Sequence, residues 1–311
     1  MFNESQNAAI VRTELDFVFY QELEYDATNP TIATANSGEL FKPQYTTHAA
    51  EVYEVFAGVG LYSQTAETGT VQLDTPKVTN KVFVNVLDWT KGVELSKNMF
   101  DDNMHGVWSR IVSDMARKAR ITQDFNAFGL IRGAQTTTLT ADGVALGGAH
   151  PLIKGGTYTN VFTGATSALS DTSLNTAIIS MRQQPDQSGV IMGNAPSILL
   201  VPSALFKLAM QLVDSALVAD NSNNAINVYR SAYAIKVMTS PYLDSVIPNG
   251  SDTQWLLLAR NHGITRLIRQ GIETDLRDWR YSNNRTYFYQ SNFRESYYVA
   301  DYVGVCVFAG V

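Results

Sequence analysis

The most regular apolar pattern in this chain runs from Asp101 to about Gly133. Apolar side chains recur there at intervals of three and four residues, the period of an amphipathic helix. After Arg117 the apolar positions shift around the helix axis, so the second half should bury a different face. A helix of this length spans roughly 40 Å, which suits a long element that crosses a flat molecule and packs against two partners. The apolar positions are Met104, Val107, Trp108, Ile111, Val112 and Met115, followed by Ile121, Phe125 and Phe128.

The first 47 residues predict a short helix followed by an extended arm. Apolar residues between Ile10 and Phe19 have the spacing of one helix face. After Asp26 the sequence becomes rich in Thr, Asn, Pro, Gly and Ala, with little to pack. Two interpretations stay open: an arm that is ordered by lying on another surface, or an ordinary frayed terminus.

Two strand-like runs, 52–59 and 77–95, flank a polar loop with Gly69 at its turn. Val82, Val84 and Val86 alternate with their neighbours at the period of two that strands show. A two-stranded ribbon is only marginally stable in water. This ribbon therefore needs a supporting surface, from its own chain or from a neighbour.

The rest of the chain predicts a mixed unit and then a strand-rich end, which makes the fold class α+β. Asp142-Gly143 is a hairpin signal. Helices and short strands alternate from about 166 to 253, the pattern of a small α/β unit. From Trp255 onward nearly every run reads as strand, with many tyrosines suited to a sheet.

Composition restricts the classes of function. The formal net charge is −6, which argues against tight wrapping by nucleic acid, because phosphate binding needs clustered cations. Only 17% of residues are charged, so much of the surface is neutral and suited to contact. The single cysteine, Cys306, excludes an internal disulfide framework and fits a reducing cytosol. We expect no secretory signal and no membrane span.

The residues that usually carry chemistry form no recognisable site. The four histidines, His48, His105, His150 and His262, are scattered without metal-ligand spacing. Gly58 and Gly60 lack the third glycine of a dinucleotide fingerprint, because Ser63 stands in its place. Cys306 lies in an alternating strand and reads as a small core residue. The sequence predicts no cofactor, no metal and no enzyme.

The long helix carries several basic residues, including Arg110, Arg117 and Arg120. Such a run usually forms a solvated face, and Asp114 and Asp124 are available as partners nearby. We favour that interpretation over a nucleic-acid site.

Two segments together resemble the major capsid proteins of tailed bacteriophages. The first is VTNKVFVNVLDWTKGVELSKNMFDDNMHGVWSRIV at 78–112, and the second is DGVALGGAHPLIKGGTYTN at 142–160. The likeness continues through VPSALFKLAMQL and the strand-rich end. It implies the Hong Kong 97-type fold, with an N-terminal arm, an extended E-loop ribbon, a peripheral (P) domain on a long spine helix, and an axial (A) domain.

The resemblance also implies a division of the chain and a set of contact residues. The expected parts are the arm at 1–48, the ribbon at 49–96, the P-domain at 97–166 and 254–311, and the A-domain at 167–253. Some relatives crosslink their subunits through a ribbon lysine, and no pattern singles out Lys77, Lys81 or Lys91 for that role. The expected contacts between subunits are Glu67, Gly69, Gln72, Asp74, Lys77, Arg110, Arg117 and Arg120.

The function implied is structural: hexamers and pentamers of this chain close into an icosahedral head around double-stranded DNA. The implied partners are copies of the chain itself, a scaffolding protein, a portal and a decoration protein, with assembly in the host cytoplasm and a final place in the virion. One alternative is an encapsulin-type compartment that encloses protein cargo. The other is a hydrolase with a dispersed carboxylate site, since paired carboxylates can escape a sequence scan.

Overall fold

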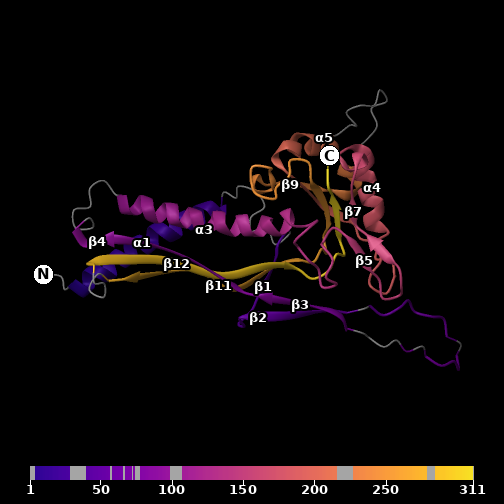
Figure 1. Cartoon of the computed structure of the whole chain (residues 1–311), viewed down its shortest axis with the longest axis horizontal. Coiled ribbons are helices and arrows are strands. Elements are labelled where there is room, and N and C mark those ends of the chain that lie inside the picture. Colours follow the sequence, from indigo (N-terminus) through magenta and orange to yellow (C-terminus); the bar gives the residue numbers. More distant parts are fainter. Residues whose placement is uncertain are drawn as a thin grey trace.

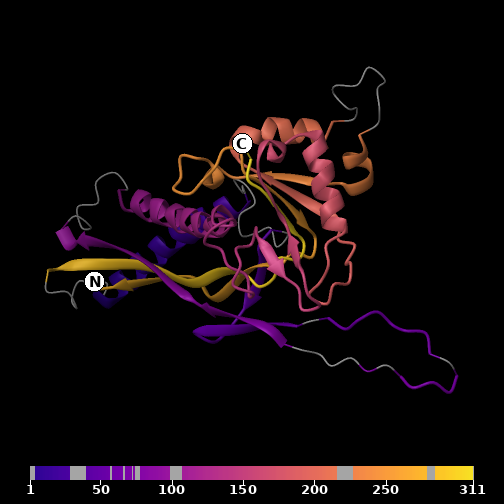
Figure 2. The same cartoon turned by 45° about the vertical axis from the view of Figure 1, so that its right-hand side comes forward.

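The computed structural model describes residues 4–28, 40–56, 58–65, 67–71, 73, 78–98, 107–215, 227–278 and 284–310. A long helix and a long sheet lie side by side, and a compact unit with a second sheet stands at one end (Figure 1). A ribbon of two strands runs below the long sheet and continues into a loop that projects past the compact unit (Figure 2).

The long helix predicted from the sequence is α3, Val107–Arg132. Its first half packs Trp108 and Val112 into one apolar cluster, and its second half packs Phe128 and Ile131 into another. The two halves therefore pack into two clusters, as predicted, but of the residues expected on the second buried face only Phe128 is buried: Ile121 is partly exposed and Phe125 is exposed. The expected start at Asp101, with Met104 and His105, lies outside the described residues.

Helix α1, Glu4–Thr28, is longer than the short helix that the sequence predicted. The reason is that no Gly or Pro interrupts the sequence before Pro30. Leu15 and Phe19 are buried in the cluster that contains the first half of α3. Asp16 accepts hydrogen bonds from Thr274 at 2.7 Å and from Tyr289 at 2.9 Å. At least this part of the terminus is ordered against its own chain, whereas the expected arm at 29–39 lies outside the described residues.

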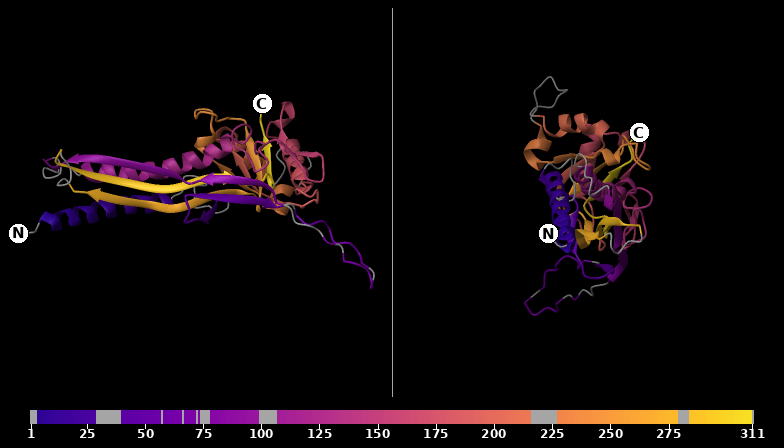
Figure 3. Two further views of the ribbon diagram at one scale, coloured as in Figure 1. Left: turned by 60° about the horizontal axis from the view of Figure 1, so that its bottom comes forward. Right: turned by 90° about the vertical axis from the view of Figure 1, so that its left-hand side faces the viewer.

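The long sheet has the strand order β1-β11-β12-β4. The hairpin of β11 and β12 forms its centre, and Figure 3 shows the indigo helix α1 on the side away from β4. Phe293 of β12 lies opposite Trp89 of β4, and their rings stack 6.5 Å apart. The strands are β1 Lys42–Tyr45, β11 Ile264–Arg277, β12 Thr286–Val299 and β4 Leu87–Ser96.

The ribbon consists of β2, Ala50–Phe56, and β3, Val78–Asn85. Its base rests on the long sheet of its own chain, because Tyr53 stacks on Tyr298 with ring centroids 4.5 Å apart. The run at 77–95, which the sequence pattern read as one ribbon strand, divides at Val86: its second part, β4, pairs with β12. Alternation continues across the division, so the period of two does not reveal the change of partner.

The compact unit contains a five-stranded sheet of order β7-β13-β10-β8-β9. One face of this sheet packs against α4 and α5, and the other joins the cluster with the end of α3. The strands are β7 Val161–Phe162, β13 Val305–Phe308, β10 Trp255–Ala259, β8 Pro196–Val201 and β9 Lys236–Thr239, and the helices are α4 Asp171–Arg182 and α5 Phe206–Val213.

Two strands of that sheet come from the C-terminal segment that was expected to belong to the P-domain. β10 pairs with β8 and with β13, so residues 255–259 and 305–308 lie in the sheet of the compact unit. Cys306 of β13 is fully buried there, as the sequence predicted. Strand β9 begins at Lys236, after a single π-helical turn at Tyr229–Tyr233.

Short elements complete the chain. β5 and β6 form a small antiparallel pair, and single helical turns join the larger elements. The predicted turn at Asp142-Gly143 is confirmed: Gly143 has φ +80°, within a bridge between Leu139 and Ala145. The bounds are β5 Ala149–Pro151, β6 Thr157–Thr159, η1 Ala165–Ser167, η2 Ser203–Leu205 and η4 Pro241–Leu243.

Candidate assembly surfaces

The loop between β2 and β3 exposes large apolar side chains that the described part of the chain leaves uncovered. Leu61 is 80% exposed, Leu73 88%, and Tyr62 103%, the value of a free side chain. At the base of the loop, the Ser188 hydroxyl donates a hydrogen bond of 2.6 Å to the Gly58 carbonyl. Exposed apolar groups gathered in one place are typical of an interaction surface.

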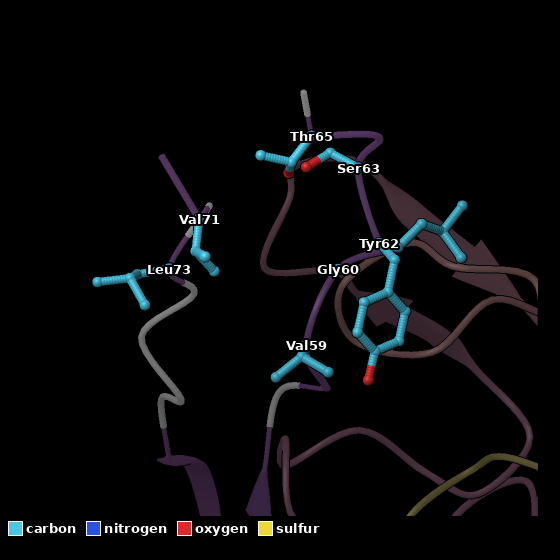
Figure 4. Close-up of a pocket in the computed structure, with 8 residues that line it drawn as sticks. Val59, Gly60, Tyr62, Ser63, Thr65, Val71 and Leu73 are labelled. Carbon is cyan, nitrogen blue, oxygen red and sulfur yellow. The ribbon is translucent and has the colours of Figure 1, made fainter. Parts of the chain in front are cut away.

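The two limbs of the loop are held apart. A cavity of about 330 Å³ separates them, lined by residues of both limbs. In Figure 4 the ring of Tyr62 lies on the side of its limb away from Val71 and Leu73. Tyr62 therefore points outward from the loop and not toward the opposite limb.

The expected contact residues of the loop are only partly described. Glu67 and Gly69 lie at the turn and are exposed. Gln72, Asp74 and Lys77 lie outside the described residues. Of the other ribbon lysines considered for a crosslink, Lys81 forms an ion pair of 2.6 Å with Glu54, and Lys91 lies in β4 opposite Ser291.

The expected contact residues of the long helix have different surroundings. Arg110 is exposed on α3. Arg117 forms an ion pair of 2.6 Å with Glu22 of α1, and Arg120 donates to the Leu23 carbonyl at 3.4 Å. Arg117 and Arg120 thus fasten α1 to α3 within one chain. The structure does not bring these arginines together with Glu67 and Gly69.

A groove beside the second half of α3 is a surface that the sequence did not reveal. Its volume is about 270 Å³, and its walls come from α3, β4 and β12. Phe125 and Leu87 at its rim are 39% and 50% exposed. The one signal in the sequence was Phe125, which continues the apolar stripe of the helix but faces outward. The lining residues are Leu87, Trp89, Phe125, Asn126, Gly129, Leu130, Arg132, Glu295, Ser296 and Tyr297.

A cluster of buried ionisable side chains lies where the long sheet meets the compact unit. His150 is fully buried, and its Nδ1 lies 2.7 Å from Oδ2 of Asp142. The His150 ring stacks on Tyr302, with centroids 4.2 Å apart. Burial opposes ionisation of Asp142, but hydrogen bonds with His150, Thr140 and the Val144 amide hold the pKa of its carboxyl below the usual value. Because the cluster is closed to solvent, we assign it a structural role.

The buried carboxyl of Asp301, in the same cluster, should lower the stability of the folded chain at neutral pH. Burial raises the pKa of its carboxyl, against the amide hydrogen bonds from Tyr302 and Val303. A raised pKa means that the folded chain holds the proton more tightly than the unfolded chain, so this group lowers stability as pH rises through its pKa. Asp301→Asn should therefore unfold at higher urea than the wild type at pH 7, and the difference should shrink as the pH falls and disappear below the pKa of an unfolded aspartate, about 3.9.

The control for that prediction is Asp252→Asn. Hydrogen bonds from Ser245 lower the pKa of the exposed Asp252 carboxyl, so this variant should lose stability at pH 7. An equal gain from Asp301→Asn at neutral and at acid pH would contradict an electrostatic origin.

Neither a metal nor a membrane site emerges from the described residues. Within the described ranges, no three His, Cys, Asp or Glu side chains gather as a metal site requires. No helix among these residues combines the length and hydrophobicity that crossing a bilayer demands.

Comparison with solved structures identifies the fold. The mature capsid of bacteriophage PhiM1 matches with a TM-score of 0.56 and 13% identity, covering 88% of this chain and 86% of that one. The capsid of cyanophage P-SCSP1u matches with a TM-score of 0.55 and 14% identity, over 89% and 88% of the two chains. A virus-like particle from Pyrococcus furiosus matches with a TM-score of 0.54 and 8% identity, over 95% and 98%.

Comparison at the level of sequence families is more specific. No curated protein sequence matched the chain. The family model for phage capsid protein matches residues 79–307, which include α3, the groove, the strands β4, β11 and β12 of the long sheet, and nearly all of the compact unit. The chain therefore belongs to the phage capsid protein family: it is a structural protein of a bacteriophage capsid, with the Hong Kong 97-type fold expected of a major capsid protein.

Proposed function

We propose that this chain is the repeating shell subunit of a tailed-phage head. Copies associate as hexamers and pentamers, which close into an icosahedral shell around double-stranded DNA. The observation that carries this proposal is the loop at 58–73, whose large apolar side chains lie exposed outside the body of the chain. A surface of this kind is stable in water when a partner covers it.

The most economical partner is a second copy of the chain. The loop and the body present different surfaces, so contact between them is heterologous and generates a ring when the rotation closes. The loop of one subunit then rests on the spine helix or the long sheet of the next. Many identical contacts of modest strength add up in such a closed assembly.

The remaining parts of the proposal follow from the phage context. The chain divides into an arm, a ribbon, a P-domain and an A-domain, and the expected bounds change in two places: β4 belongs to the long sheet of the P-domain, and β10 and β13 belong to the sheet of the A-domain. A scaffolding protein, a portal and a decoration protein are the further partners. Assembly takes place in the host cytoplasm, the DNA is enclosed without sequence-specific contacts, and the role of the chain is structural and not enzymatic.

The test is negative-stain electron microscopy with sedimentation, on the chain expressed alone and together with its genomic neighbours. Closed shells, tubes or capsomer rings are the expected result. A monodisperse monomer under both conditions would overturn the proposal.

The contents of the particles separate the two alternatives. An encapsulin-type compartment would hold protein cargo, whereas the proposed head holds DNA. A hydrolase with a dispersed carboxylate site would act on a substrate and would enclose no DNA, so DNA-filled particles would exclude both.

A further inference from the structure

The sequence contains a single Asn-Gly pair, Asn249-Gly250, and the Asn249 side chain is exposed between β9 and β10. Such a pair is prone to spontaneous deamidation, because glycine has no side chain to shield its amide nitrogen. The glycine nitrogen loses its proton to hydroxide and bonds to Cγ of the asparagine, and ammonia leaves from Cγ. Water then opens the resulting succinimide at either carbonyl, which leaves aspartate or isoaspartate.

The local backbone holds the two reacting atoms out of position. Asn249 has φ +64° and follows Pro248, which makes residues 247–250 a type II turn. The Gly250 amide donates a hydrogen bond of 2.8 Å to the Ile247 carbonyl. Attack on Asn249 needs this proton released and this peptide plane rotated, so the turn opposes both requirements.

Neighbouring contacts fix the turn on the body of the chain. Gly250 packs so closely on the carbonyls of Leu243 and Asp244 that no Cβ fits there: an added one would lie 2.8 Å from the Leu243 oxygen. The Ser251 amide donates to the Leu243 carbonyl at 2.8 Å, and Leu243 is buried in the cluster shared with the end of α3. The segment 240–251 must therefore open before the peptide plane at Gly250 can rotate.

Helix α3 supplies a second anchor for this segment. Nη1 of Arg132 donates a hydrogen bond of 2.7 Å to the Tyr242 carbonyl. The Tyr242 ring stacks on Phe128, with centroids 6.5 Å apart. Protection of Asn249 thus depends on how firmly the segment is held to α3, and not on the turn alone.

We propose that Asn249 is a deamidation site which the fold keeps closed, so that the modification accumulates in chains whose segment 240–251 has opened. Both products hinder closure. Isoaspartate adds one carbon to the main chain where Gly250 has no room to move, and either product adds a carboxylate to a stretch that already contains Asp244 and Asp252. Because ammonia is lost, the modification is a lasting mark of opening in the free subunit, whatever the shell it later joins.

Timed incubation of the purified, unassembled chain tests the protection. Samples in native buffer and in urea, at the same mildly alkaline pH, are labelled with isoaspartate methyltransferase, and the peptide that contains Asn249 is followed by mass spectrometry. The native chain should lose Asn249 roughly 10- to 100-fold more slowly than the unfolded chain, because two main-chain hydrogen bonds must break first. Asn249→Gly keeps a residue suited to positive φ and should give no label in this peptide.

The variant Arg132→Met tests the anchor on α3. It removes the guanidinium and keeps an unbranched side chain. When opening is fast relative to the chemistry, the rate follows the population of the open form, so loss of a hydrogen bond from a charged donor should speed deamidation of the folded chain roughly 10-fold. Arg117→Met is the matched control, because its ion pair joins the other half of α3 to α1, and it should deamidate at the wild-type rate.

The outcomes are distinct. Equal rates of Asn249 loss in the folded and the urea-unfolded wild type would overturn the protection. A wild-type rate in both Arg132→Met and Tyr242→Ala, with each variant folded by circular dichroism, would overturn the dependence on α3. A slow native rate that rises in these two variants and stays unchanged in Arg117→Met supports the proposal.

Discussion

Deleting residues 65–73 is expected to abolish shell formation and leave soluble monomers or capsomers. The deletion removes Val71 and Leu73, which are 71% and 88% exposed in the free chain. Burying a large aliphatic side chain contributes about 1.5–3 kcal/mol, so the loss at each contact is on the order of 3–6 kcal/mol. That is a factor of 10² to 10⁴ in association at every interface. Sedimentation and negative-stain microscopy measure the outcome.

The deletion should leave the fold of the subunit intact, which makes the result interpretable. The ribbon base keeps its own support, because Val84 is buried beside Tyr53 and Tyr298. A loop of full length with Val71→Ser and Leu73→Ser is the matched variant, and it should also fail to assemble if burial rather than loop length is what matters. Intact shells from the deleted chain would contradict the role given to the loop.

The parts of the fold that the sequence predicted are those governed by local periodicity. Apolar spacing predicted the long helix and its two packing clusters, although Ile121 and Phe125, expected on the second buried face, are not buried. The hairpin at Gly143 followed from a local turn signal. What local pattern could not give was the partner of each strand. The alternation from Val82 to Val93 is the same whether a strand pairs in the ribbon or in the long sheet.

The contact surfaces show the same limit. The loop could be predicted because its residues follow one another in the sequence. The groove could not, because its residues lie near positions 88, 127 and 296 and come together only in the folded chain. From the sequence we expected the arginines of the long helix to pair with Asp114 and Asp124 on the same helix. In the structure, Arg117 pairs with Glu22, which lies 95 positions away in the sequence. Local spacing suggests which charges are available, and tertiary packing decides which of them meet.

The largest effect on the stability of the subunit is expected from Arg266→Met. Arg266 and Glu295 form an ion pair of 2.5 Å between side chains that are 11% and 1% exposed. Glu295 also accepts hydrogen bonds from Gln123 of α3 at 3.3 Å and from Tyr297 at 3.0 Å, so it joins the helix to the sheet. Removing the arginine leaves a buried carboxylate without its counter-charge, which costs about 3–5 kcal/mol. Urea denaturation of the unassembled subunit at neutral pH measures the loss.

Two further variants test whether burial of the Arg266–Glu295 pair causes the loss of stability in Arg266→Met. The double variant Arg266→Met with Glu295→Gln removes both charges and keeps an acceptor for Tyr297, so most of the stability should return. Arg117→Met breaks an ion pair of similar length, 2.6 Å, between side chains 55% and 21% exposed, and should cost less than about 1 kcal/mol. Equal losses from Arg266→Met and Arg117→Met would mean that α3 is held to the sheet by its apolar contacts alone, and that the buried pair contributes no more than a surface one.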